Sequence, residues 1–185
     1  MNKPKILAIV GSLRKESYNL QLALAAKDML ADRADFEILN FHDVPLFNQD
    51  IEFPAPEAVT RVRQTILDAD AIWFFTPEYN HFFTGVLKNL IDWLSRSSDF
   101  LENSVLSGKP AAISGISLGM SGTAIAQDHF VTLISYLNMN VMNQPRVTIP
   151  NAMKQLDEQG KLALKISRAD LEIQIEAFLA YLAKR

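Results

Sequence analysis

The chain has 185 residues, of which 49% are hydrophobic and 21% are charged, and its formal net charge at pH 7 is -3. A chain of this length buries roughly 70% of its unfolded surface in one core, so we expect a single globular domain over residues 1–185. The mild acidity and the lack of any run of Lys and Arg longer than two exclude a surface built for a phosphate backbone, and we expect no nucleic-acid partner.

The first predicted element is a strand over Ile6–Val10, an apolar run that is too short for a signal-peptide core or a membrane span. Ala71–Phe75 and Ala111–Ser114 are runs of the same kind. None of the three alternates with polar residues, which is typical of parallel strands covered on both faces. Phe36–Leu39 and Val141–Met142 are weaker candidates, so the sequence predicts five strands.

Helical periodicity fills the stretches between the strands. The apolar positions that carry it are Leu20, Ala23 and Leu24; Val59, Val62 and Ile66; Leu87, Leu90, Ile91 and Leu94; Ile125 and 130–137; and Ile175, Phe178, Leu179 and Leu182. This alternation of strand and helix predicts an α/β fold with right-handed crossovers and helices on both faces of a parallel sheet. Pro45–Pro56 and Asn151–Lys165 are interpreted as loops.

In an open parallel sheet, ligands bind at the carboxyl ends of the strands, so the loops after the first, third and fourth strands matter most. The first of them, Gly11–Asn19, matches neither G-x-G-x-x-G nor G-x-x-x-x-G-K-[ST], which disfavours a dinucleotide Rossmann site and an ATPase site. Gly11 permits a tight turn, and the helix start behind the loop supplies free N–H groups. Four side chains add donors or charge for an anion: Ser12, Arg14, Ser17 and Asn19.

A plainer interpretation of this loop is that Ser17 caps the helix and Arg14 is a solvated surface residue. The loop after the third strand favours a ligand instead. There Pro77 stiffens the exit from the strand, and Tyr79 places a large ring where an exposed aromatic is otherwise a liability. A flat conjugated ligand would use that arrangement.

Together the segments GSLRKESYN at 11–19 and PEYN at 77–80, followed by GVLKNLIDWL at 85–94, resemble the NADPH-dependent FMN reductase family, which includes quinone, azo-dye and chromate reductases. The resemblance covers the chain from about Ile6 to Gln144. It implies a flavodoxin-like fold, a three-layer α/β/α sandwich around a five-stranded parallel sheet of order 2-1-3-4-5. It also implies FMN as cofactor and NADPH or NADH as co-substrate.

The resemblance assigns cofactor contacts to three segments. The FMN phosphate would be held by Ser12, Arg14, Ser17 and Asn19. The isoalloxazine ring would be lined by Pro77, Glu78, Tyr79 and Asn80, largely through backbone groups. A third segment, Ser114–Gly122, would flank the other edge of the ring through Ser114, Gly115 and Gly119.

One departure from the family pattern concerns the substrate. The family often carries Ser and Pro where this chain has Phe82 and Thr84. Phe82 and Phe83 would then lie near the flavin edge, so we expect them to form an apolar substrate face with His81.

Other chemistries find less support. Glu78 and His81 lie three residues apart, but two ligands fall short of a zinc site, and His42 and His129 lie in unrelated segments, so we expect no metal. A Ser/His/Asp hydrolase is disfavoured because three histidines and scattered serines are ordinary in a chain of this length.

The sequence gives only indirect indications of cellular location and oligomeric state. The absence of cysteine suits a cytoplasmic protein. The stripe with Trp93 and Leu94 is typical of a core, although Asp92 and Trp93 are also candidates for a subunit interface. Family members are commonly dimers or tetramers, which implies a homodimer or homotetramer.

The leading hypothesis is an NAD(P)H-dependent oxidoreductase that passes hydride through FMN to a small acceptor: a quinone, an azo compound, chromate or free flavin. The cofactor would carry the chemistry, so no catalytic side chain is predicted. One alternative is a flavodoxin-type electron carrier without NAD(P)H activity, although such carriers are usually more acidic than this chain. A second is a regulatory protein that has lost the cofactor, against which the four anion donors argue.

Overall fold

In the computed structural model, which describes residues 3–96 and 104–184, strands and helices alternate along the chain. The strands are β1 (Lys5–Val10), β2 (Asp35–Ile38), β3 (Ala71–Phe75), β4 (Pro110–Ile116), β5 (Asn140–Val141) and β6 (Val147–Ile149). The α-helices are α1 (Tyr18–Leu30), α2 (Glu57–Asp68), α3 (Gly85–Ser95), α4 (Ala124–Tyr136) and α5 (Arg168–Leu182). The structure also contains three short 3-10 helices, η1 (Ala31–Arg33), η2 (Gln49–Ile51) and η3 (Ala152–Gln155). The last two lie inside segments that the sequence predicts to be loops.

All strand pairs of the sheet are parallel, and their order, β2-β1-β3-β4-β5, is the predicted one. The prediction of five strands misses β6. β5 pairs with the start of β4 at Pro110 and Ala111, whereas β6 pairs with its end, at 114–116. The two short strands therefore share the fifth position, interrupted by a segment that contains Pro145, which has no N–H to donate to a ladder.

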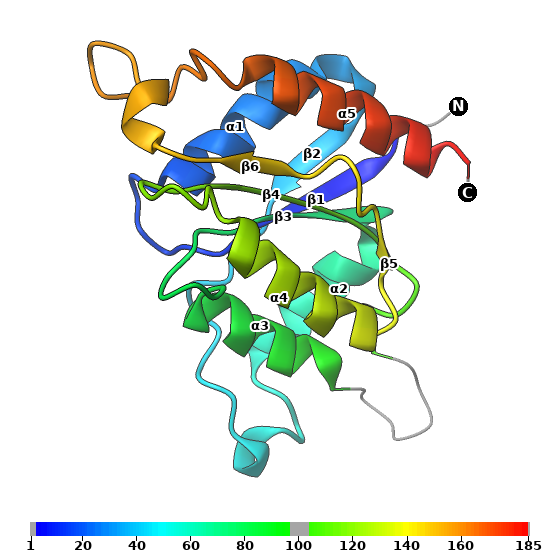
Figure 1. The fold of residues 1–185 in the computed structure, drawn as a ribbon. Coiled ribbons are helices and arrows are strands. Elements are labelled where there is room, and N and C mark those ends of the chain that lie inside the picture. The colour runs from blue at the N-terminus through cyan, green and yellow to red at the C-terminus, as the bar shows by residue number, and fades with distance from the viewer. Residues whose placement is uncertain (1–2, 97–103, 185) are drawn as a thin grey trace.

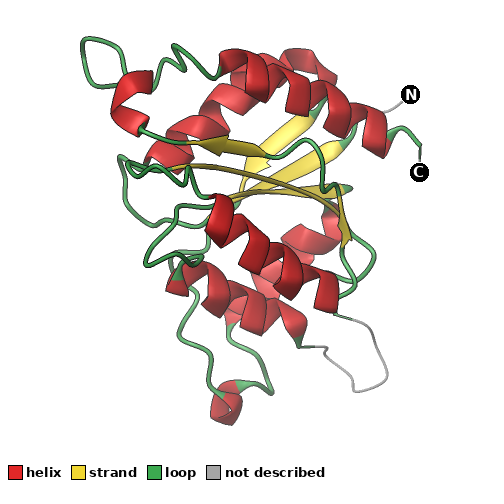
Figure 2. Ribbon diagram, viewed as in Figure 1, coloured by secondary structure: helices red, strands yellow, loops and turns green. Residues whose placement is uncertain are grey.

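Helices cover both faces of this sheet, which confirms the three-layer sandwich (Figures 1 and 2). Successive residues of a strand point to opposite faces. Accordingly Trp73 and Phe75 of β3 pack in the cluster that α1 and α5 cover, and Ile72 and Phe74 pack in the cluster under α2, α3 and α4. The longest described helix, α5, has 15 residues, and no described helix is both long and apolar enough to cross a bilayer.

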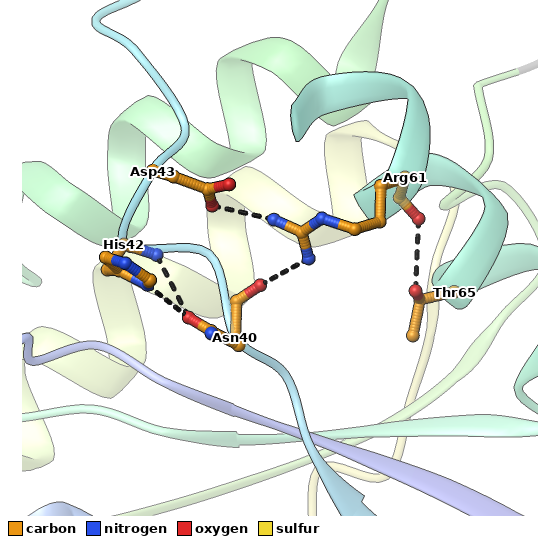
Figure 3. A network of polar contacts seen from close by, with 5 residues as sticks. All are labelled: Asn40, His42, Asp43, Arg61 and Thr65. Atoms are coloured by element: carbon orange, nitrogen blue, oxygen red, sulfur yellow. Dashed lines mark hydrogen bonds and ion pairs between the residues drawn. The ribbon is translucent and has the colours of Figure 1, made fainter. Parts of the chain in front are cut away.

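A long segment between β2 and α2 projects from the sandwich and is held at several points (Figure 1). Figure 3 shows its start, where the guanidinium of Arg61 donates to the carbonyl oxygen of Asn40 at 2.9 Å and to Asp43 Oδ1 at 2.6 Å. Farther along, the Trp93 Nε1–H donates to the Pro45 carbonyl oxygen at 2.8 Å. Trp93 is also fully buried, so it belongs to the core and is not available to a subunit interface.

The register of the sheet aligns the carboxyl ends of three strands. Val10 pairs with Phe75, and Phe75 pairs with Ser114. The Gly11 N–H donates to the Phe75 carbonyl oxygen at 2.8 Å, and the Thr76 N–H donates to the Ser114 carbonyl oxygen at 3.0 Å. The loops after β1, β3 and β4 therefore start side by side, at the left of Figure 1.

Candidate functional site

The three loops surround a cavity of about 930 Å³ at the carboxyl edge of the sheet. Its lining residues come from 12–19, 77–81 and 116–121. A second cavity of about 480 Å³ lies at the amino ends of β1 and β2, the edge opposite to the one where ligands of such sheets bind. The first cavity is therefore the candidate site.

The first wall is the start of α1. Ser17 is its N-cap residue in extended conformation, yet its side chain makes no capping hydrogen bond, and no acidic residue occupies the first turn. Ser17 is 3% exposed and lines the cavity. The interpretation of Ser17 as a simple helix cap is therefore wrong: its hydroxyl and the helix N-terminus lie beside the cavity.

Two other residues of this loop also line the cavity. The backbone N–H of Arg14 donates to Ser12 Oγ at 3.4 Å, and the Arg14 guanidinium lies 5.3 Å from the centre of the Tyr18 ring. Tyr18 lines the cavity as well, although it is not among the predicted site residues. The sequence does contain a feature that points to Tyr18, since it is an aromatic residue that directly follows the helix N-cap.

Asn19 lies at the cavity wall but is already engaged. Its Nδ2 donates to the Ile116 carbonyl oxygen at 2.9 Å, and its Oδ1 accepts from the Ile116 N–H at 3.1 Å. The side chain thereby ties α1 to the end of β4.

The second wall contains a two-residue turn. Tyr79 and Phe82 exchange two backbone hydrogen bonds of 3.0 Å, and the residues between them, Asn80 and His81, have φ values of 54° and 58°. Positive φ at both central positions is the geometry of a type I′ turn, and Asn and His adopt it more readily than most residues. The turn holds the Tyr79 ring at the cavity, 57% exposed.

The second wall is attached to the first through Thr84, the N-cap of α3. Its hydroxyl accepts from the Leu87 N–H at 3.4 Å and donates to the Gly11 carbonyl oxygen at 2.7 Å. A Cβ at Gly11 would approach Thr84 Oγ1 to 3.2 Å, so the absence of a side chain there permits the close approach of the two loops.

Glu78 carries the acidic side chain that lines the cavity, and this side chain is only 6% exposed. Burial raises the pKa of its carboxyl group, but hydrogen bonds from Ser121 and from the backbone of Ala126 outweigh that effect and hold the pKa below its ordinary value. His81 Nδ1 lies 3.5 Å from Glu78 Oε1. The predicted pair thus exists, but no group of three or more His, Asp or Glu among residues 3–96 and 104–184 has the arrangement of a metal site.

The third wall differs from its prediction at Ser114 and Gly115, which do not line the cavity. Both lie inside β4. Ser114 Oγ accepts from the Trp73 Nε1–H at 2.8 Å and bonds to the fully buried Gln174, so it belongs to the core. Gly119 does line the cavity, next to the exposed side chains of Leu118 and Met120.

The predicted substrate face is also only partly present. His81 lines the cavity, but Phe82 and Phe83 do not. Phe83 is 5% exposed because its ring packs on Phe130 with centroids 5.2 Å apart, and Phe82 lies over His129 with centroids 4.7 Å apart. Phe83 is therefore a core residue, and Phe82 lies on the outer surface beside α4.

Comparisons with known proteins find similar sequences over most of the chain. A sequence model of the family described as NADPH-dependent FMN reductase matches residues 4–154. A 2-hydroxy-1,4-benzoquinone reductase from Burkholderia sp is 38% identical over 181 residues, with 98% of this chain and 97% of that protein covered. An NAD(P)H-dependent FMN reductase from Pseudomonas aeruginosa is 40% identical over 174 residues, with 94% and 92% covered.

Among solved structures, FerB, a flavoenzyme NAD(P)H:(acceptor) oxidoreductase from Paracoccus denitrificans, superposes with a TM-score of 0.87 at 31% identity. The alignment covers 98% of each chain.

Proposed function

Because the chain belongs to the NADPH-dependent FMN reductase family, we propose that the cavity at the carboxyl edge of its sheet is the FMN site. The protein is an NAD(P)H-dependent oxidoreductase that uses FMN. The placement of the cofactor depends above all on Ser17, a residue at a helix N-terminus that is 3% exposed, lines the cavity and does not cap its own helix with its side chain. The cavity volume, about 930 Å³, is also in the range of cofactor sites.

The phosphate end of the site is assigned to the start of α1. Free N–H groups and the positive end of the helix dipole favour an anion there. Ser12 and Ser17 add hydroxyl groups, and Arg14 adds a guanidinium. Asn19 has only one amide hydrogen left beyond its bonds to Ile116. Its main role is therefore to hold the start of the helix in place.

The ring end is assigned to the other two walls. Pro77, Glu78, Tyr79 and Asn80 form one of them, and Gly119 with its neighbours Leu118 and Met120 forms the other. Apolar and aromatic side chains on both sides suit a flat conjugated ring. When bound, FMN supplies two-electron transfer from NAD(P)H to an acceptor, while the protein binds and orients the reactants. No side chain is assigned as a general acid or base.

We assign a quinone as the acceptor class. The curated relatives include a benzoquinone reductase and several quinone reductases. Tyr79, Leu118 and Met120 are exposed at the cavity and give it an apolar mouth, with His81 as a polar group at the same place. A small aromatic acceptor fits that surface better than a charged oxyanion.

The remaining assignments concern the whole protein. We propose that the chain is one domain, since a single sheet runs through it and both core clusters pack on that sheet. We also propose a cytoplasmic homodimer or homotetramer. Tyr136 of α4, at 86% exposed, is a candidate for the subunit contact, and size-exclusion chromatography with light scattering measures the assembly.

The phosphate assignment is tested with Arg14→Ala. We expect FMN to bind about 10- to 100-fold more weakly, because a charge-assisted hydrogen bond contributes roughly 1.5–3 kcal/mol. The dissociation constant is measured from flavin fluorescence during titration of the apoprotein.

Lys15→Ala is the matched control, since it removes the same charge from the neighbouring residue, which does not line the cavity. It should leave FMN affinity within a factor of about 2 of wild type, because exposed charges contribute little. Equal affinities of the two variants would place the phosphate elsewhere.

A further inference from the structure

The start of α4 lacks a cap of its own. Its N-cap residue, Thr123, has a φ of 76°, its side chain makes no capping hydrogen bond, and the first turn of the helix has no acidic residue. Thr123 Oγ1 instead accepts from Gln127 Nε2 at 3.0 Å. The first N–H groups of a helix need acceptors from outside it, so another part of the chain must provide one.

Glu78, which precedes the helix by more than forty residues, provides that acceptor. Its Oε2 accepts from the Ala126 N–H at 3.0 Å. A carboxylate is the group that the positive end of a helix favours most. The loop after β3 is thus joined to the helix that follows β4.

The same carboxylate binds the third wall of the cavity. Glu78 Oε1 accepts from Ser121 Oγ at 2.5 Å. Both residues line the cavity, Glu78 in the wall that continues into the turn at 79–82 and Ser121 in the wall with Gly119 and Met120. One buried side chain therefore links the two walls assigned to the flavin ring.

We propose that Glu78 is a positioning residue, whose carboxylate fixes the separation of these two walls by capping α4 and binding Ser121 and does not itself contact the cofactor. This inference rests on the proposed function, because it gives the flavin ring its place between the walls. This role of the Glu78 side chain is separate from that of the 77–80 backbone, which is assigned to contact the flavin ring itself.

The inference is tested with Glu78→Gln and Ser121→Ala. Gln keeps the shape but replaces one acceptor with a donor and removes the charge, and Ala removes the hydroxyl that joins the walls. We expect each variant to bind FMN about tenfold more weakly, the effect of one lost charge-assisted hydrogen bond, by fluorescence titration of the apoprotein. The double variant should be no weaker than the weaker single variant, because both changes remove the same charge-assisted hydrogen bond.

A second measurement, hydrogen exchange of the Ala126 amide, needs no FMN. Exchange in the apoprotein should be faster in Glu78→Gln and unchanged in Ser121→Ala, since the second variant keeps the cap. Ser121→Thr keeps the hydroxyl and should bind FMN more tightly than Ser121→Ala does. Glu176→Gln is the control for the change of charge, because Glu176 pairs with Arg33 of η1 and does not line the cavity.

The outcomes separate the two proposals. If Glu78→Gln speeds the exchange of Ala126 while both single variants bind FMN as wild type does, Glu78 is only a helix cap and the inference is wrong. Additive losses of affinity would also overturn it. Failure of the wild-type apoprotein to bind FMN, or full affinity in Arg14→Ala, would count against the proposed site itself.

Discussion

Two glycines near the third wall have opposite surroundings. A Cβ at Gly115 would lie 2.0 Å from Thr123 Oγ1 and 2.5 Å from the Thr76 carbonyl oxygen. A Cβ at Gly119 would meet no heavy atom within 4 Å. Gly115 is therefore required by the packing of the loops against β4, whereas Gly119 is not.

We expect Gly115→Ala to lower the free energy of unfolding by about 1–3 kcal/mol, because the added methyl group would overlap the backbone carbonyl of the fully buried Thr76. Gly119→Ala, four residues along, should change it by less than about 0.5 kcal/mol. Urea unfolding of the two apoproteins measures the difference. Similar stabilities of the two variants would show that the backbone around β4 can shift to accommodate the added methyl group.

At the scale of single residues, the sequence correctly brings three of the proposed phosphate-binding residues to the cavity, but it is misleading about Ser114. Ser12, Arg14 and Ser17 follow the first strand closely, so local order alone brings them to the cavity. Ser114 ends a predicted strand and begins the Gly- and Ser-rich segment assigned to the cofactor, but its hydrogen-bond partner is Trp73, 41 residues away. No local pattern reports a hydrogen bond between neighbouring strands.

Among the elements, α4 depends on a charge that it does not contain. The pKa of Glu78 is lowered in the folded protein, so its contribution to stability is complete above the unfolded pKa, near 4.5, and is lost as the pH falls through the lower folded value. The capping of α4 should therefore weaken over this range, because the protonated carboxyl group no longer carries the charge.

We expect wild type to be more stable than Glu78→Gln by about 1 kcal/mol at neutral pH, the typical effect of a helix cap. This difference should shrink as the pH is lowered from about 5 to about 2, because the carboxyl group becomes protonated. Urea unfolding of both apoproteins across that range measures it. A difference that stays constant with pH would contradict a charged cap.

Helix α5 shows what periodicity cannot reveal. Ile175, Phe178 and their neighbours predict the helix correctly. Its fully buried Gln174, however, donates to the carbonyl oxygens of Ile113 and Pro145, both at 2.9 Å, and bonds to Ser114. A polar residue on the buried face breaks the apolar pattern, and only the packed structure identifies the acceptors it serves.

For the whole molecule, the order of strands and helices is predictable because buried parallel strands read as unbroken apolar runs. The division of the fifth strand is not, since β5 and β6 have two and three residues and carry no periodicity. The capping of α4 by a distant loop is equally invisible, because it joins segments that meet only after the sheet has formed.

Binding of FMN should stabilise the folded protein as a unit. At a concentration 100 times its dissociation constant, it should raise the free energy of unfolding by about 2.7 kcal/mol. Riboflavin, which lacks the phosphate, should stabilise less at the same concentration, and this advantage of FMN should be smaller in Arg14→Ala. Urea unfolding with each ligand measures both effects, and equal stabilisation by the two ligands would contradict a phosphate contact.

The three cavity walls are joined in pairs through single side chains. Thr84 bonds the second wall to the first at Gly11, Glu78 bonds the second to the third, and Asn19 bonds the first to the end of β4, where the third begins. These contacts form a closed set of cross-links between the three walls, and two of the three are buried. The conformational entropy of the loops is consequently lost during folding, not during ligand binding, and reactants that come and go in each turnover meet a frame that is already rigid.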